Sequence, residues 1–205
     1  MLPLLQKCGY HYIGTIHKSD HTRVFHVVHR EQSFAFVVRL GKGHEISLLQ
    51  KLQDPPNIVR LYDTLLLNGC YGMILDKVEV YGRDLFKFFQ HNHFTLIDLF
   101  IFFGSWVLLD FDLAEEIQDR QTQSGAGTET FIAPEVERHE PHGFPADIYS
   151  AGRTLQELNL LSKLGEIGKR MLSDDPKIRP TASEVLEFLE TEKQAQRLLL
   201  QKIKY

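Results

Sequence analysis

The sequence has 205 residues, of which 43% are hydrophobic and 24% charged, proportions typical of a globular protein that buries its own core. Its 27 acidic residues outnumber the 23 basic ones and give a formal net charge of -4, so the basic surface that binds nucleic acid is not expected. The two cysteines have no metal-ligand spacing, which predicts a reducing intracellular compartment, cytoplasmic or nuclear.

The first part of the chain alternates apolar and polar residues, as strands do. Residues 23–29 and 34–39 alternate on either side of a polar turn at 30–33, which predicts a hairpin. Helical spacing follows over 44–52, and Pro55-Pro56 ends it. Strands over 58–67 and 71–78 then flank Asn68-Gly69, a strong hairpin signal. The predicted order is β-β-β-α-β-β, a small sheet with one helix.

The second part of the chain reads as helices, expected over 84–89, 146–161 and 163–172. Thr181 and Glu184 form a capping-box pattern before a final helix. Leu99 to Leu109 is apolar but shorter than the roughly 20 residues of a membrane span, so we expect a core segment and no membrane partner. A β-rich part followed by an α-rich part predicts the α+β class.

Several segments, taken in chain order, resemble motifs of the eukaryotic protein kinase family. They are Glu45–Leu49 with Pro56–Tyr62, Val107–Ala114 (the D-F-G region), Gly127–Glu135 (ending in A-P-E), Asp147–Gly152, and Asp175–Thr181 (D-P-x-x-R-P-T). The resemblance implies a two-lobed protein-kinase-like fold. Its β-rich N-lobe would cover 10–78, its shortened α-helical C-lobe 79–189, and a C-terminal helical tail 190–205.

The same resemblance implies a cleft for ATP and Mg²⁺, with weak binding. Of the glycines in the family's phosphate-covering loop, this sequence retains only Gly14. Asp76 and Val78 match the hinge, and Glu45 matches the glutamate of the first helix. Asp110 is the candidate metal ligand, with a strand-ending turn aspartate as the alternative. His17 and Lys18, near the glycine, are expected to be solvated.

The position of the phosphate-pairing lysine holds Val37, which cannot pair with phosphate. Arg39 points to the same face because strand side chains alternate. One interpretation is that its side chain reaches Glu45 or a phosphate. Lys42 is a second candidate cation. The favoured reading is a surface arginine and a loop lysine, with Glu45 left on the helix surface.

The catalytic loop H-R-D-x-x-x-x-N is absent between the hinge and Asp110, so no catalytic residue is assigned. Asp98 is the carboxylate in this gap, and its spacing indicates a helix-surface or capping role. Asp112 replaces the glycine of the D-F-G pattern and adds bulk and a second negative charge.

Glu135 and Arg179 match a buried ion pair that ties the activation segment to the C-lobe in kinases. The presumed activation segment also carries hydroxyls that accept phosphate or simply face solvent: Thr122, Ser124, Thr128 and Thr130.

Two hypotheses of function follow from the resemblance. In the first, the chain is a pseudokinase that serves as a binding or regulatory module for a protein partner. In the second, it belongs to an ATP-dependent Ser/Thr kinase acting on a protein substrate, and this form is a splice or gene-model variant without the catalytic loop. The junction at Phe103–Trp106, with family pattern on both sides, favours the second.

Overall fold

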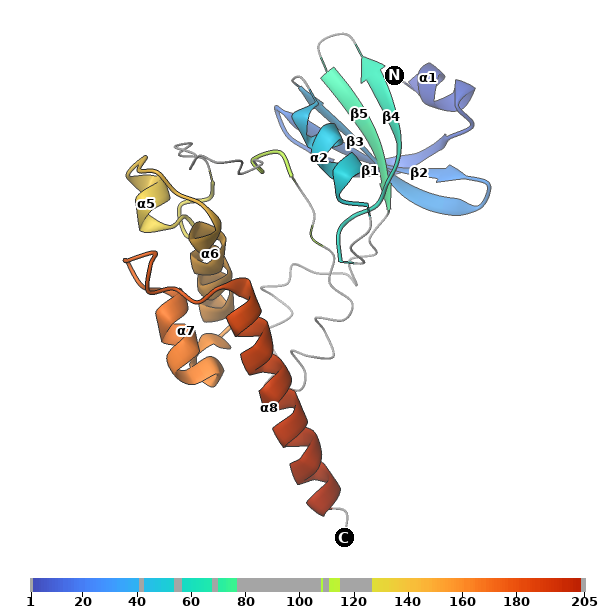
Figure 1. Cartoon of the computed structure of the whole chain (residues 1–205). Helices are drawn as coiled ribbons and strands as arrows, with labels where there is room; N and C mark the ends of the chain where they lie inside the picture. Colours follow the sequence, from blue (N-terminus) through green and yellow to red (C-terminus); the bar gives the residue numbers. More distant parts are fainter. Residues whose placement is uncertain are drawn as a thin grey trace. The chain divides into compact units, whose positions relative to one another are not determined.

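The computed structural model describes residues 2–40, 43–53, 57–67, 70–76, 108, 111–114 and 127–203. In Figure 1 the strands come first along the chain and most of the helices follow. The α+β class is confirmed. The chain divides into two compact units, which are Met1–Gly82 with Ser105–Ala114, and Arg83–Gly104 with Glu115–Tyr205.

The first unit holds a five-stranded antiparallel sheet in the order β1-β2-β3-β5-β4. Its strands are β1 His11–Lys18, β2 Thr22–His29, β3 Gln32–Leu40, β4 Leu61–Leu67 and β5 Cys70–Asp76. Both predicted hairpins are confirmed. The first turn is shorter than expected, because only Arg30 and Glu31 lie between the strands, with φ of 49° and 69°. Positive φ at both central residues is typical of a tight hairpin turn.

The start of the fourth strand was predicted too early. Ile58 lies outside β4 and forms an isolated parallel bridge with Leu108. The backbone N–H of Val59 donates to the oxygen of Leu108 at 3.1 Å, and that of Leu108 donates to the oxygen of Asn57 at 2.7 Å. These bonds connect Leu108 to the chain just before β4.

Helix α2, His44–Lys51, is confirmed where the sequence predicts it. Alternation along β3 separates two apolar clusters. Phe34, Phe36 and Val38 belong to one cluster, which also contains Ile74 of β5. Val37 belongs to the other, where it packs with Leu49 of α2 and with residues of β5.

A short helix at the start of the chain, α1 Leu2–Lys7, was not predicted. Its Leu5 side chain is 1% exposed and joins the cluster that contains Phe34 and Phe36. The oxygen of Leu5 also accepts the backbone N–H of Tyr10 at 2.9 Å. Tertiary packing, which local sequence does not encode, therefore stabilises this helix.

Both outer strands of the sheet contain irregular pairing. In β1 the register shifts between Tyr12 and Gly14 and again between Thr15 and His17. In β4 it shifts between Leu61 and Asp63. The inner pairs of β2 with β3 and β3 with β5 run without such shifts.

The described part of the second unit is helical. Its elements are α5 Pro134–Glu137, α6 Phe144–Glu157, the 3-10 helix η1 Leu161–Leu164, α7 Gly165–Met171 and α8 Ala182–Ile203. Helix α6 begins and ends slightly earlier than predicted. In place of the single helix predicted over 163–172, the chain forms η1 and then α7, which ends at Met171. The helix expected over 84–89 lies outside the described residues.

Helix α8 begins with the predicted capping box. The N–H of Glu184 donates to the Thr181 hydroxyl at 3.2 Å, while the N–H of Thr181 donates to the Glu184 carboxylate at 2.7 Å. The helix then continues across residue 189 without a break. No helix in the described ranges is both long and apolar enough to cross a membrane. Of the apolar stretch predicted to be buried, Leu108 is described and is 62% exposed, contrary to expectation.

Candidate functional site

A buried ion pair joins the sheet to helix α2. The Arg39 Nε atom of β3 lies 3.2 Å from Glu45 Oε2 of α2, and the two side chains are 12% and 2% exposed. The favoured prediction of a surface arginine and a helix-surface glutamate is therefore wrong. The pairing follows from strand alternation, which directs Arg39 and Val37 to the face that α2 covers.

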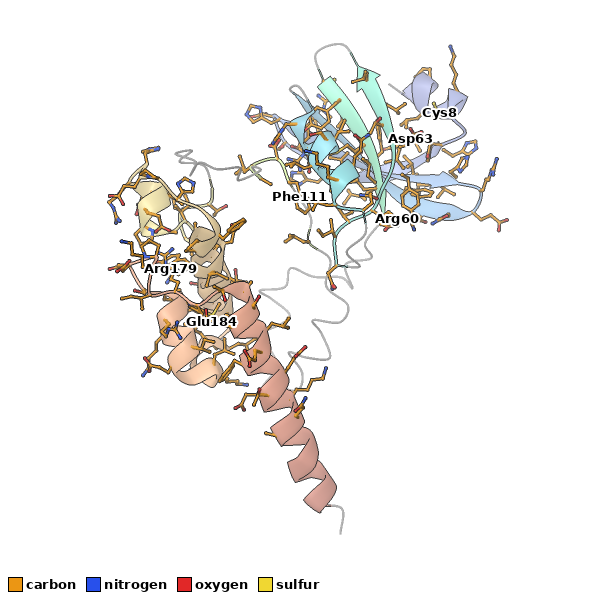
Figure 2. The ribbon with its side chains drawn as sticks, in the orientation of Figure 1. Cys8, Arg60, Asp63, Phe111, Arg179 and Glu184 are labelled. Atoms are coloured by element: carbon orange, nitrogen blue, oxygen red, sulfur yellow. The ribbon has the colours of Figure 1, made fainter. Side chains whose placement is uncertain are left out.

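Glu45 accepts hydrogen bonds from two other elements. The backbone N–H of Phe111 donates to Oε1 at 2.9 Å, and the Tyr71 hydroxyl of β5 donates to Oε2 at 3.4 Å. In Figure 2, Phe111 is labelled below α2 in the sheet unit. A buried carboxylate is costly unless it is paired and hydrogen-bonded. Arg39 provides the opposite charge, and Phe111 and Tyr71 provide the hydrogen bonds.

The same contacts affect Tyr71. Burial, together with the nearby negative charges of Glu45 and Asp112, raises the pKa of the Tyr71 hydroxyl. The hydroxyl therefore stays protonated and donates to Glu45 at neutral pH. Sequence reasoning did not identify Tyr71, and its position on the α2-facing side of β5 was the available signal.

Asp112 completes this group of charges. Its Oδ2 lies 3.1 Å from Arg39 Nη1, and its side chain is 51% exposed. The guanidinium therefore contacts Glu45 through Nε and Asp112 through Nη1. One residue beyond this turn, the Ala114 oxygen lies 3.1 Å from His44 Nε2 of α2. We call Arg39, Glu45 and Asp112 the charge cluster.

The predicted hinge lies at the other end of β5. Asp76 pairs with Phe34, whereas Tyr71 pairs with Arg39, so five residues of strand, about 16 Å, separate the hinge position from the charge cluster. Asp76 Oδ1 accepts a hydrogen bond from the Tyr62 hydroxyl at 2.8 Å. Val78 lies outside the described residues.

Gly14 lies in the edge strand β1, where it pairs with His26. A Cβ added there would meet nothing within 4 Å. Nothing in the described structure therefore requires glycine at this position. His17 and Lys18, at the end of β1, are exposed as expected.

Other predicted residues lie outside the described residues, so their predictions stay untested. They are Asp110, Lys42, Asp98, Thr122 and Ser124. Thr128 and Thr130 are described and exposed, and the Thr130 oxygen accepts a hydrogen bond from Arg153 Nε at 2.9 Å.

The charge cluster fits a nucleotide with magnesium poorly. Val37, at the position where a lysine would meet phosphate, is 7% exposed and packed in an apolar cluster. The cation that β3 supplies, Arg39, already faces two carboxylates.

The second unit contains the predicted ion pair. Arg179 donates from Nη1 and Nη2 to the two carboxylate oxygens of Glu135 at 2.6 and 2.8 Å, and the side chains are 0% and 4% exposed. Burial alone would raise the pKa of Glu135, but the hydrogen bonds and charge of Arg179 outweigh it and lower the pKa. Figure 2 labels Arg179 in this unit.

No protein-family model matches the chain. It is similar to Serine/threonine-protein kinase WNG1 of Toxoplasma gondii, with 33% identity over 107 residues that cover 47% of this chain and 16% of that protein. It is 27% identical to Mitogen-activated protein kinase kinase kinase 2 of Arabidopsis thaliana, covering 80% of this chain and 30% of that protein.

A third relative is Mitosis inhibitor protein kinase mik1 of Schizosaccharomyces pombe, 25% identical, with 85% of this chain and 38% of that protein covered. The chain thus matches only 16 to 38% of the length of these three relatives. Each of them is a protein kinase by name, and the similarity to two of them extends over most of this chain. The chain is a relative of the protein kinases.

Proposed function

We propose that this chain is a pseudokinase, a two-lobed protein-kinase-like module that binds and regulates a protein partner without transferring phosphate. The observation that carries the proposal is the charge cluster. Val37 is buried among apolar side chains, and Arg39 is paired with Glu45 and Asp112. Phosphate transfer depends on cations positioned at the phosphates, and an ion pair of the strand cation with the helix glutamate is compatible with that role. The second carboxylate, Asp112, is the contact that competes with a phosphate for Arg39.

The absence of the catalytic loop from the sequence supports the same proposal. Without H-R-D-x-x-x-x-N, the chain has neither the aspartate that orients a substrate hydroxyl nor the asparagine that holds a second metal ion. By contrast, the Glu135–Arg179 pair is intact and buried. The chain thus retains an ion pair that stabilises the fold but lacks the catalytic-loop residues.

Any nucleotide binding is proposed to be weak and dependent on magnesium, with Asp110 as the metal ligand. Gly14 is the single glycine left of the phosphate-covering loop, so few bare backbone amides approach a phosphate there. We place the protein in the cytoplasm or nucleus because of its cysteine use.

The test is a phosphotransfer assay on the purified chain. The protein is incubated with labelled ATP, magnesium or manganese, and a generic basic substrate, beside an Asp110→Ala variant. We expect no label above background in either sample. Label transferred by the unmodified chain and lost in Asp110→Ala would show that the chain is an enzyme and would overturn the proposal.

A second function is supported by the comparisons. The match to the fission yeast kinase extends over 224 aligned positions, more than the 205 residues of this chain, so that relative has residues within the matched region that this chain lacks. This favours an active Ser/Thr kinase gene of which the present chain is a shortened product. Sequencing transcripts across the codons for residues 90–110 separates the two functions. An insert encoding H-R-D would support the kinase, and its absence from every transcript would support the pseudokinase.

A further inference from the structure

One departure from the kinase pattern, Asp112, belongs to the charge cluster, and another, Val37, lies two residues before Arg39 on the same face of β3. Val37 stands where the pattern has lysine, and Asp112 stands where it has glycine. Arg39, on the same face of β3 as Val37, lies 3.1 Å from Asp112. The glycine replacement thus provides a carboxylate for a cation that is shifted by two residues along the strand.

We propose that Asp112 takes the place of nucleotide phosphates at Arg39 and thereby lowers the affinity of this chain for polyphosphate ligands. The proposal rests on the proposed weak binding of nucleotide, and it names the residue that sets that weakness.

The chemistry of the guanidinium supports the proposal. Arginine has a planar fork of N–H donors that pairs with carboxylate and phosphate in similar ways. Here Nε faces Glu45 and Nη1 faces Asp112, so two edges of the fork already contact carboxylates. A phosphate that approaches Arg39 competes with these carboxylates for the N–H donors and meets their negative charge as it does so.

Burial indicates which carboxylate gives way. Glu45 is 2% exposed and also accepts hydrogen bonds from Phe111 and Tyr71. Asp112 is 51% exposed. A half-exposed ion pair contributes little free energy, so Asp112 is the partner that an anion displaces more readily. It is therefore a competitor for Arg39, whereas Glu45 is a fixed structural partner.

The test compares ligand affinities of variants by isothermal titration calorimetry. The probes are ATP with magnesium, inorganic tripolyphosphate, and adenosine. Asp112→Asn removes the charge at constant size, and Asp112→Gly places the family's residue. We expect both variants to bind ATP and tripolyphosphate about five- to tenfold more tightly, the effect of removing one surface ion pair and one like charge. Adenosine affinity should not change.

Two further variants make the test specific. Adding Arg39→Met to Asp112→Asn should abolish the gain, because the gain acts through Arg39. Glu140→Gln is the matched control, since Glu140 also pairs with an arginine, Arg138, and is 49% exposed, but it lies in the other unit. Its ligand affinities should equal those of the unmodified chain. Circular dichroism and thermal melts confirm that each variant is folded.

The proposal is overturned if neither Asp112 variant gains affinity for tripolyphosphate, or if the gain persists without Arg39. These outcomes are independent of the phosphotransfer assay. A chain found to be an enzyme would refute the pseudokinase function and leave the competition at Arg39 to be decided by the affinities. Absence of transfer together with unchanged affinities would refute only the role of Asp112.

Discussion

Removal of the Glu135 charge is expected to destabilise the second unit strongly. In Glu135→Gln, the fully buried Arg179 guanidinium loses its counter-charge, and one of its two carboxylate bonds, of 2.6 and 2.8 Å, is replaced by a facing amide donor. Its bonds to the Ser173 and Pro145 oxygens, of 2.8 and 3.0 Å, remain. Leaving one buried charge without its partner costs about 3–5 kcal/mol, which we expect as the loss in stability.

The measurement is amide hydrogen exchange in α5 and α6, because a chain of two units need not unfold in one step and local exchange reports the opening of one region. Glu140→Gln serves as control, since it removes a carboxylate from an exposed pair with Arg138 and should cost less than about 1 kcal/mol. Glu135→Gln with Arg179→Met should cost less than Glu135→Gln alone, because no unpaired charge stays buried. Equal exchange in Glu135→Gln and Glu140→Gln would refute the reasoning.

Three other outcomes are expected. Hydrogen bonds outweigh burial and lower the folded-state pKa of Glu135. The stability that Glu135 contributes is therefore present above the ordinary glutamate pKa of about 4.3 and is lost as the pH falls through the lowered pKa. Urea titrations across this range should show that acidification reduces the free energy of unfolding less in Glu135→Gln than in the unmodified chain. Gly72→Ala should cost about 1–3 kcal/mol because a Cβ there would lie 2.5 Å from a core phenylalanine ring, whereas Gly14→Ala, with nothing within 4 Å, should stay within about 0.5 kcal/mol in the same denaturation assay. Thr181→Ala should cost about 1 kcal/mol, measured as faster amide exchange in the first turn of α8, and unchanged exchange would contradict the cap.

Elements with a clear period were predicted well from the sequence. Alternation over 23–29 and 34–39, and the capping box at Thr181, each correspond to an observed element. Helix α1 was missed because its stability depends on the burial of Leu5 against a distant part of the chain. The start of β4 was placed too early because Ile58 is apolar, although it forms a bridge with Leu108, through the backbone of Asn57 and Val59, and does not pair with β5.

The charge cluster was predicted only in part. Strand alternation placed Arg39 on the correct face, but whether a long side chain reaches solvent or Glu45 depends on where α2 packs. Asp112 was recognised as a replacement for glycine, but its contact with Arg39 joins residues more than 70 positions apart in the sequence, and no local pattern encodes such a contact. Glu135 and Arg179 were predicted as a pair from the family motifs, since no local pattern connects positions so far apart in the sequence.

The irregular pairing in the outer strands has a consequence for the behaviour of the protein in concentrated solution. An outer strand with regular pairing offers a row of free N–H and C=O groups on which strands of other molecules can add. The two register shifts in β1 and the one in β4 interrupt that row on both sides of the sheet. His17 and Lys18 add polar and charged side chains at the end of β1. The sheet is thereby protected against edge-to-edge aggregation, because the backbone of its outer strands offers a poor template for another strand.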